Sequence, residues 1–218
     1  MMQIQDYDNE ADWLEARKEF ITASDAANYC NVNAYDPNGA TNLWLAKTGI
    51  KPRPYIGDKP QVIMGNKAED PVRQLFMLQH PEFTLIYNEY GLYVNDKTPW
   101  AAATLDGLLV DNTTADLYIY EGKTTTVRNR EGFKQWYDNG VPVNYIAQGS
   151  HQLMVVEEAK GIFFFCWQMI GWDMDSHLLE RYKSREEMES NIETCRFMGQ
   201  EMANNIKKGI RPIQKFIL

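Results

Sequence analysis

An aspartate and a Glu-x-Lys triplet carry the first chemistry that this sequence suggests. Asp106 precedes a short apolar run, and after a spacer of fourteen residues Glu121, Gly122 and Lys123 end the run DLYIYEGK. Side chains alternate between the two faces of an extended strand, so Glu121 and Lys123 share a face with the apolar residues before them. A carboxylate and an ammonium on a core-facing side are costly to bury without a purpose. The pattern predicts a functional strand over residues 117–125.

Glu69 adds a third acid to this set. It borders the apolar stripe of a predicted helix over residues 65–79, where the alternative is an ordinary solvated carboxylate. Mg²⁺ prefers oxygen ligands and is usually held by a few carboxylates together with waters. Three carboxylates on adjacent elements could hold one or two such ions, which would polarise a phosphodiester and activate a water. Lys123 could orient that water or stabilise the developing charge.

A change in the spacing of apolar residues along the chain predicts the helices and strands that position these residues. Helical spacing predicts helices from Asp8 or Asn9 to about Phe20 and over 42–48, 65–79, 131–138, 142–158 and 185–208. Alternation predicts a mostly antiparallel meander over 83–87, 90–94, 100–104, 107–110 and 117–125, then strands over 161–170 and 172–182. The run GIFFFCWQMI is typical of a central strand covered on both faces. We expect one domain over residues 1–218, with an α/β (α+β) fold in which helices flank a mixed β-sheet.

The composition of the chain indicates its cellular compartment and the kinds of partner it can bind. The chain has 44% hydrophobic and 24% charged residues, as a globular protein does. Its longest apolar stretch is too short to span a membrane, and its N-terminus lacks a signal-peptide pattern. The widely spaced Cys30, Cys166 and Cys195 predict a reducing, cytoplasmic setting and no zinc or iron–sulfur site. A net charge of −8 argues mildly against nucleic acid, although DNA responds to local patches rather than to the total.

Arg17 and Ser24 suggest an anion site near the N-terminus. Arg17 lies on the apolar face of the first predicted helix, and the alternative is a stem that packs on Trp13 with its guanidinium in water. Ser24 stands at a predicted helix start, where free N–H groups beside a hydroxyl suit an anion, although capping explains it equally well. His151, on the helix over 142–158, is expected to be a packed residue rather than a catalyst.

The order of several short segments resembles the lambda-exonuclease family, also called YqaJ-type viral recombinases, within the PD-(D/E)xK nuclease superfamily. The segments are WLEARKEFITASDAA, LWLAKTG, MGNKAEDPVRQLF, AAATLDGLL, YIYEGKTTT and YIAQGSHQLMVV, over roughly residues 13–156. In that family a W…R…ITAS start, a WGxxxE helix, an SPDG turn, an ExK strand and a YxAQ helix follow in this order. Each motif is weak alone, whereas their shared order is specific. The resemblance implies a PD-(D/E)xK restriction-endonuclease-like core.

The resemblance implies a role for each matching acid and for the lysine. Glu69 matches the helix carboxylate of the family, Asp106 the aspartate before glycine, and Glu121 the strand glutamate. Lys123 matches the catalytic lysine. Asp106 and Glu121 are therefore expected to be metal ligands, with Glu69 near or on the metal and the carbonyl of Gly122 as a further ligand.

A second group of matches implies a phosphate pocket. Arg17, Ser24 and Gln148 match family positions that grip the 5′-terminal phosphate of DNA, for which a guanidinium fork and a hydroxyl at a helix start are suited. Departures from the family pattern occur at three places. Thr104-Leu105 replaces Ser-Pro, Gly122 replaces the apolar residue inside ExK, and Met64 replaces Trp. None of them removes a charged catalytic group.

The resemblance further implies a Mg²⁺-dependent exodeoxyribonuclease, with Mn²⁺ as a substitute, that degrades double-stranded DNA 5′ to 3′ from a 5′-phosphorylated end. The product would be a 3′ single-stranded overhang for phage-type recombination with a single-strand annealing protein. A homo-oligomer, such as the trimeric ring of relatives, is also implied, and no membrane partner is expected. Residues in or beside loops are candidates for DNA contact, with solvation as the simpler account: Lys47, Lys51, Arg53, Arg128 and Arg130.

Two other functions stay open at this point. One is a structure-specific or endonucleolytic nuclease on the same core, which would lack the 5′-phosphate pocket. The other is a non-catalytic DNA-end-binding module of the recombination machinery. Retention of all four charged residues speaks against the module, and retention of Arg17, Ser24 and Gln148 speaks against the endonuclease. The expected location is the cytoplasm, that of the host cell if a phage encodes the chain.

Overall fold

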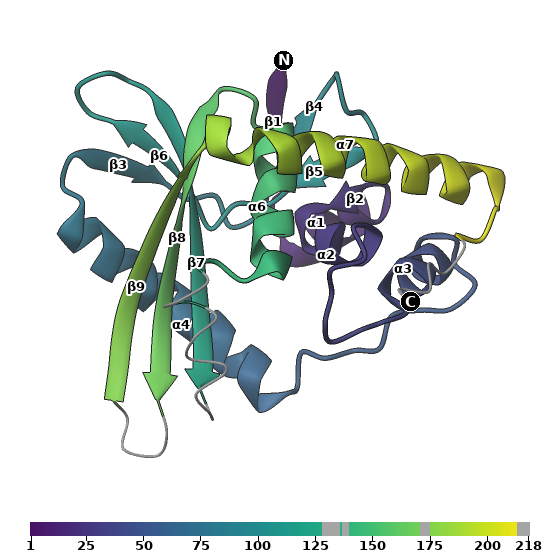
Figure 1. Cartoon of the computed structure of the whole chain (residues 1–218), viewed down its shortest axis with the longest axis horizontal. Helices are drawn as coiled ribbons and strands as arrows, with labels where there is room; N and C mark the ends of the chain where they lie inside the picture. Colours follow the sequence, from purple (N-terminus) through teal and green to yellow (C-terminus); the bar gives the residue numbers. More distant parts are fainter. Residues whose placement is uncertain (128–135, 137–139, 171–174, 213–218) are drawn as a thin grey trace.

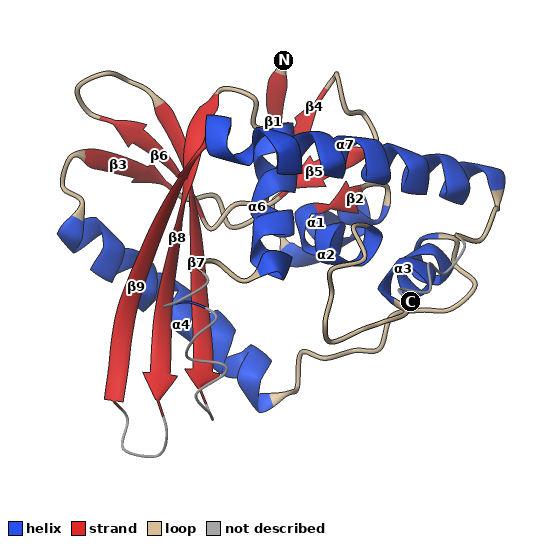
Figure 2. Cartoon of the chain, in the orientation of Figure 1, coloured by secondary structure: helices blue, strands red, loops and turns tan. Residues whose placement is uncertain are grey.

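Two mixed β-sheets and the helices around them form the fold (Figures 1 and 2). The computed structural model describes residues 1–127, 136, 140–170 and 175–212. A four-stranded sheet has the order β1-β4-β5-β2, and a five-stranded sheet has the order β3-β6-β7-β8-β9. Within the described residues, no helix is both long and apolar enough to cross a membrane.

The five-stranded sheet carries the Glu-x-Lys strand at its centre. Its members are β3 (Phe83–Ile86), β6 (Gly107–Asp111), β7 (Leu117–Val127), β8 (Ala159–Ile170) and β9 (Asp175–Ser184). β7 pairs antiparallel with β6 and parallel with β8, and β9 runs antiparallel to β8. An interior strand buried on both faces reads as continuous apolar sequence, which explains the run GIFFFCWQMI in β8.

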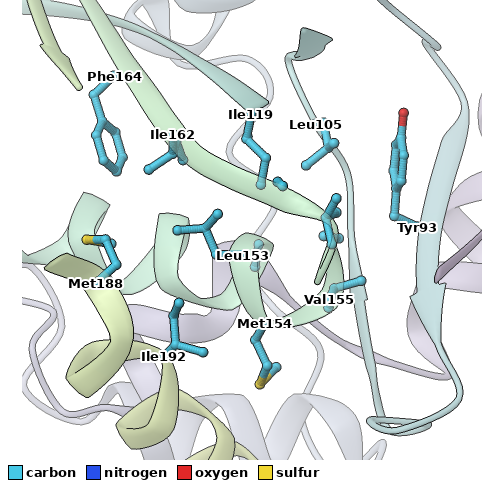
Figure 3. Close-up of a cluster of buried hydrophobic side chains, with 14 of the residues drawn as sticks. Tyr93, Leu105, Ile119, Leu153, Met154, Val155, Ile162, Phe164, Met188 and Ile192 are labelled. Carbon is cyan, nitrogen blue, oxygen red and sulfur yellow. The ribbon is translucent and has the colours of Figure 1, made fainter. Parts of the chain in front are cut away.

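Helices cover both faces of this sheet. On one face lies α4 (Pro60–Gln79), whose Phe76 packs with Tyr120 and Phe165. On the other face lie α6 (Val143–Val155) and α7 (Arg185–Lys208). Figure 3 shows the core on that side, where these side chains from β7, β8, α6 and α7 meet: Ile119, Ile162, Phe164, Leu153, Met188 and Ile192. The sheet is therefore the middle layer of three.

The smaller sheet begins with the N-terminus of the chain. It consists of β1 (Met2–Asp6), β4 (Gly91–Asn95), β5 (Ala101–Ala103) and β2 (Ile21–Thr22). The helices α1 (Glu10–Lys18) and α2 (Ala26–Tyr29) and the 3₁₀ turn η1 (Ala23–Asp25) adjoin it. A further helix, α3 (Gly39–Lys47), follows α2. Both α1 and η1 therefore lie near the strands of this sheet.

A buried histidine of α6 bonds to the smaller sheet and to α2. The hydroxyl of Tyr29 and Nδ1 of His151 are 2.7 Å apart, and Nε2 of His151 is 3.1 Å from the carbonyl oxygen of Ala102 in β5. Burial lowers the pKa of His151 to about 4, so the imidazole is neutral at physiological pH. Nε2 therefore donates to the carbonyl, and Nδ1 accepts from the tyrosine. The expected packed role of His151 agrees with this arrangement.

The predicted fold class is confirmed, and several element boundaries differ. α4 begins at Pro60 rather than at residue 65, because proline suits the first turn of a helix. α3 begins at Gly39 rather than at 42, and α6 ends at Val155 rather than at 158. The predicted meander was wrong in its pairing, since β4 and β5 belong to the smaller sheet. The helix predicted over 131–138 falls almost wholly outside the described residues.

Candidate active site

Glu121 lies at the centre of a hydrogen-bonded cluster on β7. The expected alternation is present, with Ile119 and Glu121 fully buried on the side of α6 and Tyr120 packed toward α4. Oε1 of Glu121 accepts from the ammonium of Lys123 and from Nε2 of Gln148 at 2.5 Å. Both carboxylate oxygens are held, because Oε2 accepts from Nε2 of Gln152, also at 2.5 Å.

Asp106 approaches the same part of β7 from the segment before β6. Its Oδ2 accepts from the backbone N–H of Gly122 at 2.9 Å and lies 4.0 Å from Nζ of Lys123. Nε of Arg73 in α4 donates to the backbone carbonyl of Asp106 at 3.0 Å, which fixes this turn from the other face of the sheet. The aspartate and the Glu-x-Lys triplet therefore meet in space, as their spacing suggested.

Glu69 reaches the cluster from α4. It lines a cavity of about 280 Å³ together with Gly122, Lys123 and Thr124. Burial raises the pKa of Glu69, and the negative charge of Asp106 raises it further. The structure thus brings Glu69, Asp106, Glu121 and Lys123 together at the middle of β7.

The electrostatics of this cluster are dominated by burial. Burial raises the pKa of Glu121 to about 7, with Asp106 adding to the rise and Lys123 opposing it. Burial lowers the pKa of Lys123, but Glu121 and Asp106 outweigh that effect, so its pKa is raised. The cluster therefore stabilises the charged form of Lys123, whereas the negative charges of Glu121 and Asp106 repel each other.

The oxygen donors at this site suit a hard divalent cation. Within the described part of the chain, no three His, Cys, Asp or Glu side chains are arranged as a metal site, and Glu121 bonds to nitrogen donors instead. Mg²⁺ usually needs only one or two carboxylates, because it keeps several waters. Asp106, Glu121 and the carbonyl of Gly122 are the donors that could hold it, with Glu69 nearby. Their assignment as ligands stays a prediction.

The residues expected to hold a 5′-phosphate make separate sets of contacts. Gln148 bonds to Glu121 in the acid cluster. Cζ of Arg17 lies 4.3 Å from the centre of the Trp13 ring, so the guanidinium itself stacks on that ring. Ser24 is exposed in η1, with its Oγ 3.0 Å from Oγ1 of Thr22. Helix α6, which carries Gln148, packs against η1, and the assignment of the three residues to one phosphate pocket stays a prediction.

A buried carboxylate that the sequence did not single out organises the surroundings of Arg17 and Ser24. Asp25 is 1% exposed and accepts from the backbone N–H of Thr22 at 2.9 Å and from Arg53 at 2.5 Å. The charge of Asp25 also acts on Arg17, whose pKa is lowered chiefly by burial. The Thr-x-x-Asp spacing of a capping box was the available signal.

The other basic residues proposed for DNA contact differ in their exposure and in the contacts that they already make. Nζ of Lys47 donates to the backbone carbonyl oxygens of Arg17 at 3.1 Å and of Lys18 at 3.3 Å, so it has a structural task. Lys51 is exposed, and Arg53 is half-exposed beside Asp25. Arg128 and Arg130 lie outside the described residues. Gln152, four residues after Gln148 on α6, is a functional candidate for which only this helical spacing gave a signal.

Comparison with known proteins places the site in a family. The sequence profile of the YqaJ-like viral recombinase domain matches residues 12–159, which include Glu69, Asp106, Glu121 and Lys123. The chain belongs to the YqaJ-like viral recombinase domain family. The expected family resemblance is thereby confirmed. A relative from Bacillus subtilis (strain 168), named as the uncharacterized protein YqaJ, is 28% identical over 190 residues. The match covers 78% of this chain and 51% of the relative, so this YqaJ-like chain spans about half the length of that protein.

Solved structures share the fold of this YqaJ-like chain. An alkaline exonuclease from Laribacter hongkongensis, LHK-Exo, superposes with a TM-score of 0.64 at 15% sequence identity. The match covers 93% of this chain and 97% of that enzyme. The complex of LHK-Exo with dAMP gives a TM-score of 0.65 at the same identity and coverage. The three-layer architecture of this chain is therefore a fold that LHK-Exo also has.

Proposed function

We propose that this chain is a Mg²⁺-dependent exodeoxyribonuclease that degrades double-stranded DNA 5′ to 3′ and leaves a 3′ single-stranded overhang. The observation that carries the proposal is the meeting of Glu69, Asp106, Glu121 and Lys123 at the middle of β7. Membership of the recombinase family and the fold shared with LHK-Exo support a nuclease. That enzyme also binds dAMP, a mononucleotide of the kind an exonuclease releases.

The proposed metal site uses the oxygen donors of this chain. Asp106, Glu121 and the carbonyl of Gly122 would hold Mg²⁺, with Mn²⁺ as a substitute, and Glu69 would bind a water or the ion. When bound, the ion supplies Lewis-acid polarisation of the phosphodiester and lowers the pKa of a water. The buried position of Glu121 keeps bulk water from screening these charges.

The remaining groups orient and stabilise. Lys123 places an ammonium where charge develops on the phosphate, and it costs no reorganisation because Glu121 and Asp106 already hold it. Gln148 and Gln152 each donate to one oxygen of Glu121 and so fix the plane of its carboxylate. A positioned carboxylate and a fixed cation are what an in-line displacement at phosphorus requires.

The choice of DNA end is assigned to the region around η1. Arg17 and Ser24, with Arg53 beside them on Asp25, offer cations and a hydroxyl that suit a 5′-phosphate. Gln148 belongs by its contacts to the acid cluster, and we propose that it orients Glu121. The substrate is then a duplex with a 5′-phosphate, and the partner a single-strand annealing protein. A ring-shaped homo-oligomer would let basic residues line a channel in a chain of net charge −8.

One assay tests the proposal. The chain is incubated with Mg²⁺ and a linear duplex with 5′-phosphate ends, the same duplex with 5′-hydroxyl ends, and a covalently closed circle. We expect fast release of mononucleotides from the phosphorylated duplex, slower release from the hydroxyl duplex, and an intact circle. EDTA should stop the reaction, and Mn²⁺ should restore it.

Other outcomes would change the assignment. Cleavage of the circle would assign an endonuclease on the same core. Equal rates on the two linear duplexes would remove the preference for a 5′-phosphate. Binding of duplex ends without turnover, in either metal, would leave a DNA-end-binding module.

A further inference from the structure

A second cavity lies between two connections of the helical region. It has a volume of about 300 Å³. The segment that leads from α2 to α3 and the segment that leads from α3 to α4 can be followed in Figure 1. Asn28 of α2 lines the cavity with Asn33 and Asp36 of the first segment, and Lys51 and Arg53 line it on the second. A volume of this size is at the lower end for small-molecule pockets and suits a group the size of a nucleobase.

Hydrogen bonds preform the first wall of this cavity. Asp36 accepts from Nδ2 of Asn42 at 2.9 and 3.1 Å and from the backbone N–H of Asn38 at 3.1 Å. Oδ1 of Asn28 accepts from Nδ2 of Asn33 at 2.8 Å. The wall therefore presents amide groups at fixed positions, and such groups recognise the edges of unpaired bases by hydrogen bonding.

Two tyrosines extend from the segments that form the walls. Tyr35, between Asn33 and Asp36, is 86% exposed, and Tyr55, two residues after Arg53, is 82% exposed. Gly57 makes room for the second ring: a Cβ added to Gly57 would lie 2.6 Å from Cζ of Tyr55. The hydroxyl end of the Tyr55 ring thus lies beside the backbone of Gly57 while the side chain stays open to solvent. An exposed ring is suited to stacking on a base.

The segment that forms the second wall is positively charged, whereas the whole chain is negatively charged. Residues 51–59 read KPRPYIGDK, so Lys51, Arg53 and Lys59 less Asp58 give +2, whereas the whole chain carries −8. Basic side chains interleaved with aromatic ones are the combination that binds a single strand without sequence preference.

The cavity is linked to η1. Arg53 lines the cavity and bonds to Asp25, the neighbour of Ser24. A strand bound here would therefore lie beside the region to which the proposed function assigns the 5′-phosphate.

We propose that this cavity and Tyr55 bind an unpaired DNA strand, with a base stacked on Tyr55, an adjacent base in the cavity, and phosphates on Lys51 and Arg53. The proposal rests on DNA being the substrate of the proposed function, and it adds a site for the single strand that resection exposes. Stacking and cation contacts do not depend on hydrolysis. Binding of single-stranded DNA can therefore be measured where the nuclease is silent.

The test uses fluorescence anisotropy of a fluorescein-labelled oligothymidylate with the full chain in EDTA. We expect Tyr55→Ala to raise the Kd about tenfold, because loss of one stacked base costs on this order, and Tyr55→Phe to stay within about twofold. Lys51→Gln should lower the slope of log Kd against log salt concentration by about 0.7, the value for one phosphate contact of a single strand. Phe197→Ala, which removes a 72% exposed ring from α7, is the matched control and should bind as the wild type does.

Three results would overturn the proposal. The first is wild-type protein that hydrolyses duplex DNA in Mg²⁺ without binding the oligothymidylate, which would leave the nuclease assignment untouched. The second is an equal Kd for Tyr55→Ala and the wild type. The third is a Tyr55→Ala variant that changes sedimentation of the free chain but not the Kd, which would make this surface a contact between copies. Single-strand binding by a chain that hydrolyses no DNA would support this site and remove only the nuclease.

Discussion

Asp25 and Glu121 are both buried carboxylates, and their surroundings act on them in opposite directions. Asp25 is 1% exposed, and Glu121 is 0% exposed. Burial raises the pKa of Asp25, but Arg53, Lys47 and the N–H of Thr22 outweigh it, so the pKa is lowered. Burial raises the pKa of Glu121 to about 7, and Asp106 adds to the rise. Although both carboxylates are buried, the surroundings of Asp25 stabilise its negative charge, whereas those of Glu121 destabilise its negative charge.

The difference separates a structural acid from a functional one. Asp25 completes a capping box and faces more cations than acids, so its charge stabilises the fold. Glu121 shares its cation, Lys123, with Asp106. Groups kept in an unfavourable protonation environment cluster at functional sites. The comparison predicts that substitutions at the two positions affect different observables.

The largest expected effect follows from removing the cation of the functional cluster. Lys123→Ala should lower kcat on linear duplex DNA by about 10³-fold, because it removes a preorganised charge at the reacting phosphate. Duplex binding measured in EDTA should change by less than about threefold. Lys160→Ala, at an exposed lysine that pairs with Asp116, is the control. Retention of kcat in Lys123→Ala would take the lysine out of the mechanism.

The next effect concerns the structural acid. Asp25→Asn should lower the free energy of unfolding by about 2–3 kcal/mol, because it leaves buried cations without their counter-charge and weakens the cap of η1. Urea unfolding followed by tryptophan fluorescence measures the change. Asp58→Asn, at an exposed aspartate, should stay within about 0.5 kcal/mol. An equally small change for Asp25→Asn would show that the charge of Asp25 does not stabilise the fold.

The same acid gives a pH dependence of defined sign. The folded pKa of Asp25 is lowered relative to the unfolded chain, so its contribution is fully present above about pH 4. It is lost as the pH falls through the lowered folded value. The difference in unfolding free energy between the wild type and Asp25→Asn should therefore close in acid. A difference that stays constant from pH 7 to pH 3 would contradict an ionised Asp25.

The smallest expected effect is on stability at the functional acid. Glu121→Gln should change the free energy of unfolding by less than about 1 kcal/mol, because the lost pairing with Lys123 is offset by the removed repulsion from Asp106. Its nuclease activity should be absent. Unfolding in EDTA, beside Asp25→Asn, measures the first quantity. A cost at Glu121 as large as that at Asp25 would remove the distinction between the two acids.

Local periodicity predicted the strand that carries the site. Alternation in β7 placed Glu121 opposite Tyr120, and the short spacer placed Asp106 on the neighbouring strand. These inferences succeeded because antiparallel neighbours in sequence pair directly. The grouping of Glu69 with the other acids was a hypothesis from metal chemistry that the family resemblance supported, since nothing in a helix sequence states which strand the helix will cover.

The pairing of strands that lie far apart in the chain could not be predicted from the sequence. β1 pairs with β4 across more than eighty residues, and β2 has only two residues, so neither shows a periodic signal. Asp25 and Arg53 were likewise hidden, because each looks like an ordinary surface charge until the chain folds. Gln148 was assigned from resemblance alone, and only the structure joins it to Glu121.

The adjacent residues His151 and Gln152 give α6 a mechanical role. His151 holds Ala102 in the smaller sheet, and Gln152 holds Glu121 in the larger one. A rotation of the helix about its axis would break both attachments at once, because neighbouring side chains point in directions about 100° apart. Both sheets are thereby bonded to the same helix. We expect any adjustment to the proposed DNA substrate to occur in the connections outside these attachments, which include the walls of the second cavity.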